Sequence, residues 1–259
     1  MLLKGSEGEK GRKLGPFEAA ISAIFSALVC VATIIFTVYV PQTRGFFNVG
    51  ETMVYITALL FGPVIGGVSG GFGSMLADLL LGYTQFAPAT LIIKGCEGVV
   101  VGFLNTRRPK SGSEKYWRPV TAILGVVVGL LLAGVGSIYY SGEVEIYLGT
   151  SESPAFIFNV PAELWYIIGT VVALSIVIVG IKIEPELGWT IFSIIIGGLI
   201  MVLGYFIYEY KILIGEAAYA EIPVNIGQMS VGLTIAIPVV RAVWRYMPSL
   251  KAKSFKGKV

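Results

Sequence analysis

The feature that most constrains this chain is a series of long apolar segments joined by short polar connections. Crossing the hydrocarbon core of a bilayer takes about 20 mainly apolar residues in a helix. The chain is 55% hydrophobic and only 14% charged, whereas soluble domains carry about 25% charged residues. We predict an all-α polytopic membrane protein. Its expected spans are residues 17–40, 46–61, 64–81, 87–106, 119–140, 162–181, 189–210 and 222–246.

The number of spans depends on residues 46–81. The second segment is short, the third is rich in glycine, and only Gly62-Pro63 separates them, which indicates a tight turn. Two separate helices give about eight spans. A single broken element in their place gives seven.

The distribution of lysine and arginine favours eight spans. Basic residues gather before residue 17, between residues 107 and 118, and after residue 240. Basic residues mark cytoplasmic loops, and only an even number of spans puts all three groups on one side. We therefore expect a cytoplasmic N-terminal tail at 1–16, one transmembrane domain at 17–246, and a basic cytoplasmic tail at 247–259. Both termini of this cell-membrane protein would be cytoplasmic.

The chain contains no histidine, which removes several functional classes. Ser-His and Cys-His nucleophile pairs are absent, as are imidazole metal sites. No phosphate-binding Gly-x-x-x-x-Gly-Lys-Ser/Thr loop occurs, so any ATP would be hydrolysed by another chain. We expect no enzyme activity, no cofactor and no metal site. Cys30 and Cys96 lie in apolar segments and are interpreted as core residues, not a disulfide.

Ionisable residues nevertheless occur inside the apolar segments, notably between Asp78 and Gly98. Such residues are costly in hydrocarbon and usually face a protein interior or a cavity. Thr90, Lys94 and Glu97 follow helical spacing and form one stripe, and Glu221, Asn225 and Gln228 form another. The expected topology puts both stripes at the outer end, with Lys94 about 10 Å deep at 1.5 Å per residue.

These groups predict a solute pocket in the outer third of the membrane. Aromatic rings near it are expected to stack on a flat ligand, and they are Phe46, Phe47, Tyr83, Phe86 and Tyr205. The alternative is a purely structural role, in which Lys94 only neutralises neighbouring acids and the side-chain amides of Asn225 and Gln228 only hold helices together. The candidate substrate-binding residues are Asn48, Glu51, Asp78, Tyr83, Thr90, Lys94, Glu97, Tyr205, Glu209, Glu221, Asn225 and Gln228.

Small residues form two further stripes. Gly62, Gly66 and Gly70 predict close helix packing. Ala19, Ala23 and Ala27 line one face of the first segment at its cytoplasmic end. Spacing alone leaves two interpretations of this alanine stripe, internal packing or a docking surface for a partner helix.

Several motifs carry a family resemblance. They include Asn48-Val-Gly-Glu51, Ala-Asp78-Leu-Leu-Leu-Gly82-Tyr83 and Lys94-Gly-Cys-Glu97-Gly98. The C-terminal part adds Gly204-Tyr205-Phe206 and Glu221-Ile-Pro-Val-Asn225-Ile-Gly-Gln228. Through these motifs, residues 17–106 and 189–246 resemble the substrate-binding (S) component of energy-coupling-factor (ECF) vitamin transporters, of the riboflavin and hydroxymethylpyrimidine type.

The resemblance implies a protein that binds a vitamin in its outer half and docks on a transmembrane coupling subunit driven by two ATPases. The family's docking stripe maps to Ala19, Ala23 and Ala27, and its gating loop to residues 41–50. The family's usual fold has six helices, so residues 119–181 are interpreted as an inserted transmembrane hairpin with a long outer loop. Two interpretations stay open for Glu163, Trp165 and Tyr166 at its outer end, a contribution to the pocket or anchoring at the membrane interface, and we favour anchoring.

The function expected from these arguments is uptake of a vitamin or vitamin precursor, such as riboflavin, thiamine or hydroxymethylpyrimidine. The excess of carboxylates favours a cationic or hydrogen-bond-donating ligand. The alternative is a stand-alone secondary transporter in which Asp78, Lys94 and Glu97 relay protons.

Overall fold

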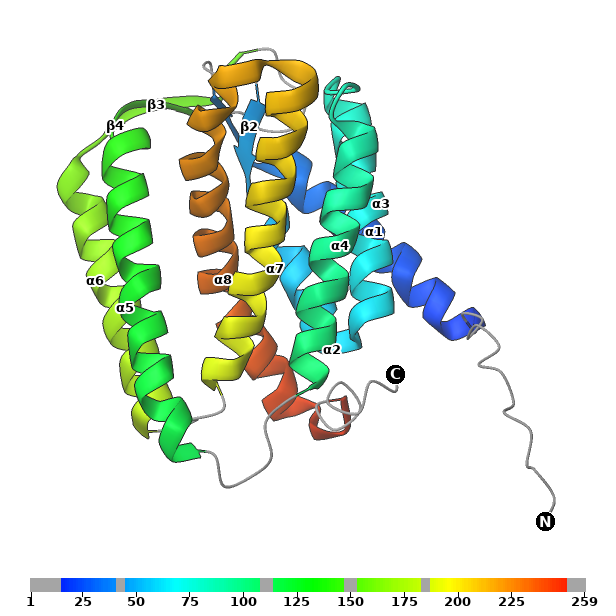
Figure 1. Ribbon diagram of the computed structural model, residues 1–259, viewed down its shortest axis with the longest axis vertical. Helices are drawn as coiled ribbons and strands as arrows, with labels where there is room; N and C mark the ends of the chain where they lie inside the picture. Colours follow the sequence, from blue (N-terminus) through cyan, green and yellow to red (C-terminus); the bar gives the residue numbers. More distant parts are fainter. Residues whose placement is uncertain (1–14, 41–44, 108–113, 147–152, 183–186, 251–259) are drawn as a thin grey trace.

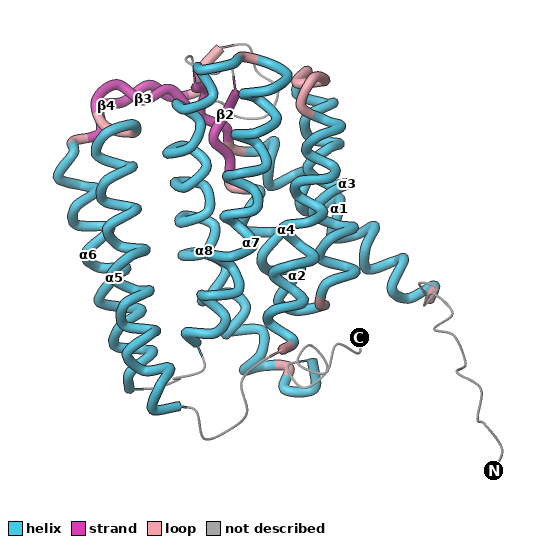
Figure 2. Tube along the Cα trace, viewed as in Figure 1, coloured by secondary structure: helices cyan, strands magenta, loops and turns pink. Residues whose placement is uncertain are grey.

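The computed structural model describes residues 15–40, 45–107, 114–146, 153–182 and 187–250, and within these ranges the protein is a bundle of helices with two small β-hairpins at one end (Figures 1 and 2). The helices are α1 (Pro16–Ile35), α2 (Gly50–Phe61), α3 (Pro63–Leu81), α4 (Ala87–Thr106), α5 (Glu114–Tyr139), α6 (Ala162–Lys182), α7 (Leu187–Tyr208) and α8 (Glu221–Tyr246). A π-helical turn (Glu209–Leu213) and a 3-10 turn (Gly215–Ala220) join α7 to α8.

Six of the described helices are long and apolar enough to cross a membrane: α1, α3, α4, α5, α7 and α8. Two shorter apolar helices accompany them, α2 and the stretch Ala162–Ile178 of α6. The predicted helical membrane architecture is confirmed. The count of about eight spans goes beyond the six long helices, because α2 has only 12 residues and is therefore about 18 Å long.

The predicted bounds of the first two spans were wrong because part of each forms a β-strand. Helix α1 ends at Ile35, and residues Thr37–Val40 form β1. Strand β2 (Gly45–Asn48) pairs antiparallel with it, placing Thr37 opposite Asn48 and Val38 opposite Phe47. The β-branched and aromatic residues of these segments favour extended structure. Their apolar character had made them look like helix ends.

A second hairpin was also not predicted. Strands β3 (Gly142–Ile146) and β4 (Phe156–Val160) pair antiparallel between α5 and α6, in the region expected to be an outer loop. Both hairpins lie at the same end of the bundle (Figure 2).

The Gly62-Pro63 turn is confirmed and separates α2 from α3. Gly62 has φ +84°, a conformation that glycine adopts without the steric cost of a Cβ atom. Pro63 then occupies the first position of α3, where its missing N–H is not needed.

Helices α3 and α4 approach closely through glycine. A Cβ atom on Gly98 would collide with the backbone of Gly66 and Gly67. The glycine stripe of α3 therefore does serve close helix packing, as the small-residue spacing predicted.

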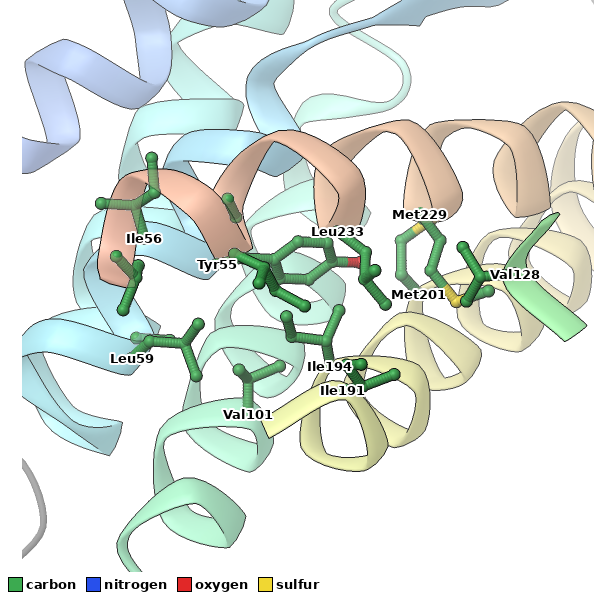
Figure 3. Packing of buried hydrophobic residues seen from close by; sticks show 14 of the residues in the cluster. Tyr55, Ile56, Leu59, Val101, Val128, Ile191, Ile194, Met201, Met229 and Leu233 are labelled. Carbon is green, nitrogen blue, oxygen red and sulfur yellow. The ribbon is translucent and has the colours of Figure 1, made fainter. Parts of the chain in front are cut away.

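The apolar core lies between α2, α4, α5, α7 and α8 (Figure 3). Tyr55, Ile191 and Leu233 are among its fully buried side chains. Helices α5 and α6 stand side by side at one edge of the bundle (Figure 1).

Replacing Gly98 with alanine should destabilise the protein, because the new methyl group meets backbone that cannot rotate away. Overpacking of this kind costs about 1–3 kcal/mol, and a lower thermal unfolding temperature in detergent would reveal it. The matched control is Gly95→Ala on the same helix, whose Cβ would lie 3.6 Å from the carbonyl oxygen of Gly67. Equal unfolding temperatures for the two variants would contradict this account of the α3–α4 contact.

Candidate functional site

A small polar cavity lies at the end of the bundle that carries the hairpins. Its volume is about 50 Å³. Strand β2 and helices α3, α4, α7 and α8 contribute to it, together with the turns beside them. The lining residues are Phe46, Asn48, Asp78, Tyr83, Phe86, Thr90, Lys94, Tyr205, Glu209, Glu221, Asn225 and Gln228.

Local backbone structure explains how these side chains converge. Alternate residues of a strand face opposite sides, so Phe46 and Asn48 of β2 face the polar cavity while Phe47 does not. On α8, Glu221, Asn225 and Gln228 share one helical face. The π-helical turn after α7 begins with Glu209, which is 2% exposed.

Lys94 stands at the base of the cavity and is ion-paired with two acids. It pairs with Glu51 of α2 and, at 3.5 Å, with Glu97 one turn further along α4. The other carboxylate oxygen of Glu97 accepts a 2.9 Å hydrogen bond from the Tyr55 hydroxyl. All three charged residues are less than 5% exposed. This cluster ties α2 to α4 and keeps the buried cation neutralised.

Two hydrogen-bond networks line the walls. In the first, the Thr90 hydroxyl donates to Asp78 at 2.5 Å and lies 2.8 Å from the Tyr205 hydroxyl. In the second, the Gln228 side-chain oxygen accepts hydrogen bonds from the backbone and side-chain nitrogens of Asn48, at 2.7 and 3.0 Å. The side-chain nitrogen of Gln228 donates to Asn225 at 3.3 Å.

Oε2 of Glu209 and Nδ2 of Asn225 are among the buried polar atoms of the lining residues that have no hydrogen-bond partner in the described part of the chain. Buried polar groups are nearly always satisfied, and leaving one unpaired costs about 1–3 kcal/mol. Because Glu209 and Asn225 both line the cavity, a bound solute or water is the natural partner for this acceptor and this donor.

Aromatic rings flank the same space. The rings of Phe46 and Tyr83 are 4.6 Å apart, and those of Tyr83 and Phe86 are 6.4 Å apart. The Lys94 ammonium lies 5.5 Å from the centre of the Tyr205 ring. Flat rings and hydrogen-bonding groups around one cavity suit a planar polar solute.

The structure brings together all the expected binding residues except two. Glu51 and Glu97 do not line the cavity and instead lie against Lys94. Both interpretations of Lys94 agree with its geometry, since it neutralises acids and also lines the cavity. A binding role for these residues remains a prediction. Within the described chain, no group of three or more histidine, cysteine or acidic residues is arranged to hold a metal ion.

The expected position of Phe47 was wrong. It lines a second, almost wholly apolar cavity of about 240 Å³ beneath the hairpins. Tyr140, Trp165 and Val231 are among the other residues of its wall. Sequence analysis missed this cavity, because it lies between helices whose apolar faces have no distinctive spacing.

Comparisons with known proteins identify the class of protein to which this chain belongs. The family described as "ECF-type riboflavin transporter, S component" matches residues 17–183, which is more than half of the chain. The chain belongs to this family. It is a multi-pass membrane protein and a transporter component, not an enzyme. The matched range includes residues 119–181 and ends before α7, so Tyr205, Glu209 and the α8 residues of the cavity lie outside it.

Two relatives show similarity over parts of the chain. An uncharacterized protein of Pyrococcus woesei is 40% identical over 131 residues, which cover 51% of this chain and 80% of the relative. The thiamine precursor transporter HmpT of Lactococcus lactis subsp. cremoris is 32% identical over 81 residues, 31% of this chain. The similarity spans about half (49%) of HmpT.

Replacing Lys94 with methionine should strongly destabilise the protein, because Glu51 and Glu97 would remain buried without a cation. Removing one partner of a buried ion pair costs about 3–5 kcal/mol, measurable as a lower unfolding temperature. Lys211→Met, at an exposed lysine of the π-helical turn, is the matched control. The loss of stability in the double variant Lys94→Met/Glu51→Gln should be smaller than the sum of the losses in the single variants Lys94→Met and Glu51→Gln. Strict additivity would mean that the pair has no energetic coupling.

Proposed function

We propose that the protein is the substrate-binding subunit of an ATP-driven ECF transporter and takes up a vitamin or vitamin precursor through the polar cavity. The observation that carries this proposal is that two residues lining one small cavity each have a buried polar atom without a hydrogen-bond partner among the described residues, Oε2 of Glu209 and Nδ2 of Asn225. A bound solute would satisfy both atoms. Family membership supports the transport role.

The character of the cavity favours a small ligand. Its volume of about 50 Å³ is far below the ~300–1,000 Å³ of typical ligand sites, so the cavity must open to admit any vitamin, and a single heteroaromatic ring requires less opening than a three-ring flavin. Acids outnumber bases among the described residues of its lining, where Lys94 is the one basic residue. Amino groups or a positive charge on the ligand would complement these acids. A hydroxymethylpyrimidine- or thiamine-like solute fits both requirements, and the partial similarity to HmpT agrees with this.

The direct test is a ligand panel with purified protein. A ligand that binds only the folded state raises the unfolding temperature in proportion to its occupancy. We expect hydroxymethylpyrimidine or thiamine to raise it more than riboflavin does. A larger shift with riboflavin would overturn the single-ring proposal but keep the transporter assignment. No shift with any of the three, and no co-purified small molecule, would count against the polar cavity as a vitamin site.

Removing one carboxylate from the cavity should weaken ligand binding. In Glu209→Gln the side chain keeps its shape but loses the charge that would pair with a cationic ligand. A hydrogen bond to a charged group contributes about 1.5–3 kcal/mol, so we expect a rise in Kd of about tenfold to a hundredfold by calorimetry. Glu216→Gln, at an exposed glutamate in the neighbouring 3-10 turn, should leave Kd unchanged. Unchanged affinity in Glu209→Gln would place the ligand elsewhere.

The proposed topology has about eight spans, with a six-helix S-component bundle and residues 119–181 as an inserted hairpin. Helix α2 is too short to cross the bilayer by itself and would lie within the membrane, inside the bundle. Support comes from the basic residues Arg107, Arg118 and Arg245, which would be cytoplasmic together with both termini.

Cysteine labelling in intact cells tests this topology. A cysteine introduced at exposed Glu143 of the β3–β4 hairpin should react with a membrane-impermeant maleimide added from outside. A cysteine at exposed Arg118 should react only after the cells are opened. The native Cys30 and Cys96 are replaced in both strains. The reverse pattern would mean that the orientation is inverted.

The docking surface for the coupling subunit is proposed on α1. Ala19, Ala23 and Ala27 are exposed, while Ser22 and Ser26 between them are buried. The Ser22 carbonyl accepts a 3.2 Å hydrogen bond from Ser69 of α3. The alanine face is thus directed away from the internal α1–α3 contact. This supports docking over internal packing.

A bulky residue in this stripe should block assembly. Ala23→Leu places a large side chain where a partner helix would approach closely, so co-purification with the coupling subunit and ATPases should fall sharply. Binding of the vitamin should persist, because Ala23 is remote from the polar cavity. Ala242→Leu, at an exposed alanine of α8, is the control. Normal assembly of Ala23→Leu would move the docking surface elsewhere.

The alternative of a stand-alone proton-coupled transporter makes an opposite prediction. Its uptake would proceed in vesicles that lack any ATPase and would follow the proton gradient. Uptake that requires the coupling subunit and ATP supports the proposed subunit role.

A further inference from the structure

Tyr140, which directly follows α5, carries a buried polar group that the fold does not use. Its hydroxyl is shielded from solvent and has no hydrogen-bond partner within the described part of the chain. Buried polar groups in folded proteins are nearly always paired. The expected partner of this hydroxyl is therefore a bound ligand or an ordered water, and its surroundings favour a ligand.

The ring of Tyr140 is held in place on two sides. Its centre lies 5.2 Å from the centre of the Phe47 ring and 6.2 Å from that of Trp165. The indole nitrogen of Trp165 also donates a 2.8 Å hydrogen bond to the backbone carbonyl of Tyr140. A side chain that is already ordered loses little conformational entropy when it binds a ligand. The hydroxyl of Tyr140 is therefore preorganised for binding.

The same ring lies against the part of α8 that supplies the polar lining. A Cβ atom built on Gly227 would lie 3.7 Å from Cε2 of Tyr140, and Gly227 is next to the lining residue Gln228. Tyr140 also packs against the small apolar cluster that contains Val224. Val224 lies one helical turn after Glu221, another residue of the lining. Tyr140 is thus beside the stretch of α8 from which the polar cavity receives its side chains.

The hydroxyl itself belongs to the polar side of this boundary. It contributes almost nothing to the surface of the apolar cavity, which is almost wholly apolar although the Tyr140 ring is part of its wall. The pKa of the Tyr140 hydroxyl is raised above its usual value, first by burial and second by the negative charge of Glu221. The hydroxyl is therefore within electrostatic reach of a residue that lines the polar cavity, and it stays protonated and able to donate.

We propose that Tyr140 is a further ligand-binding residue, whose hydroxyl donates a hydrogen bond to a hydroxyl group of the vitamin. This role rests on the proposed function of the polar cavity. The cavity must open to admit a vitamin, and opening along α8 toward Gly227 brings the ligand to Tyr140. A ligand hydroxyl suits this position better than a carbonyl. It accepts from the phenol and can donate to the acids of the lining, whereas a carbonyl has only lone pairs.

The test uses the intact protein, purified in detergent, and two ligands that differ by one hydroxyl group. They are hydroxymethylpyrimidine and the same pyrimidine with a methyl group in place of the hydroxymethyl group. A site that binds a ligand hydroxyl rejects the analogue lacking it, and one buried hydrogen bond corresponds to about tenfold in Kd. Calorimetry should show that the unmodified protein prefers hydroxymethylpyrimidine at least tenfold. Tyr140→Phe, which keeps the ring, should lower this preference about tenfold and leave the Kd of the analogue unchanged.

The matched control is Tyr139→Phe, at the exposed neighbouring tyrosine, which should leave both Kd values unchanged. Without ligand, Tyr140→Phe should unfold at the same temperature as the unmodified protein or higher, because the lost hydroxyl had no partner among the described residues. A clear decrease would indicate a structural role and overturn the proposal.

An unchanged preference in Tyr140→Phe would overturn the proposal as well. If Glu209→Gln weakens binding in the same assay and Tyr140→Phe does not, the polar cavity stands as the vitamin site and only the role of Tyr140 fails. If neither pyrimidine binds, the role of Tyr140 fails, and the proposed function fails with it unless thiamine or riboflavin binds.

Discussion

The buried ion pair between Lys94 and Glu51, completed by Glu97, is the interaction on which the rest of the bundle depends. A lysine with 4% exposure inside membrane helices must be neutralised, because an isolated cation in hydrocarbon is very costly. Glu51 lies at the start of α2, so neutralisation requires this short helix to stay inside the bundle. The Tyr55 hydroxyl, one turn further along α2, binds the same cluster through Glu97. Helix α2 is therefore fixed by charge at one end and by the apolar core along its length.

Close packing of α3 on α4 brings the cluster of Lys94, Glu51 and Glu97 together with the part of the polar cavity that α3 lines. The backbones can approach only because Gly66 and Gly98 carry no side chain at the contact. The approach lets Asp78, near the end of α3, accept a hydrogen bond from Thr90 on α4. Thr90 in turn lies within hydrogen-bond distance of Tyr205 on α7. Packing by glycine and the polar network are thus parts of one arrangement.

Sequence reasoning predicted the parts of this arrangement that follow helical periodicity. The stripes of Lys94 and Asn225 were recognised because residues three or four apart share a helix face, and the Gly62 turn because glycine and proline interrupt apolar segments. The hairpins were not predicted: an apolar segment near a membrane face is compatible with either a helix end or a strand. The strand decides that Phe46 and Asn48 face the polar cavity while Phe47 faces the apolar one. Neither the apolar cavity nor the cavity between α6, α7 and α8 could be predicted, because a void depends on how far whole helices stand apart.

Among the described residues, the lining of the polar cavity comes from β2, α3, α4, α7, α8 and their adjoining turns, and none of it comes from the hairpin of α5 and α6. The sequence had left open whether these two helices reshape the site. Side chains of α5 and α6 instead line the apolar cavity beside β2, and side chains of α6 also line a cavity between α6, α7 and α8. The lining of the proposed solute site therefore requires no side chain from the described part of this hairpin, and Tyr140 would add to it only once the cavity opens. Phe47 and Asn48 are adjacent on one strand, however, so a shift of β2 alters both compartments together. We therefore expect packing in the apolar cavity to influence how firmly β2 holds Asn48 against Gln228, which would give the hairpin an indirect effect on the polar site.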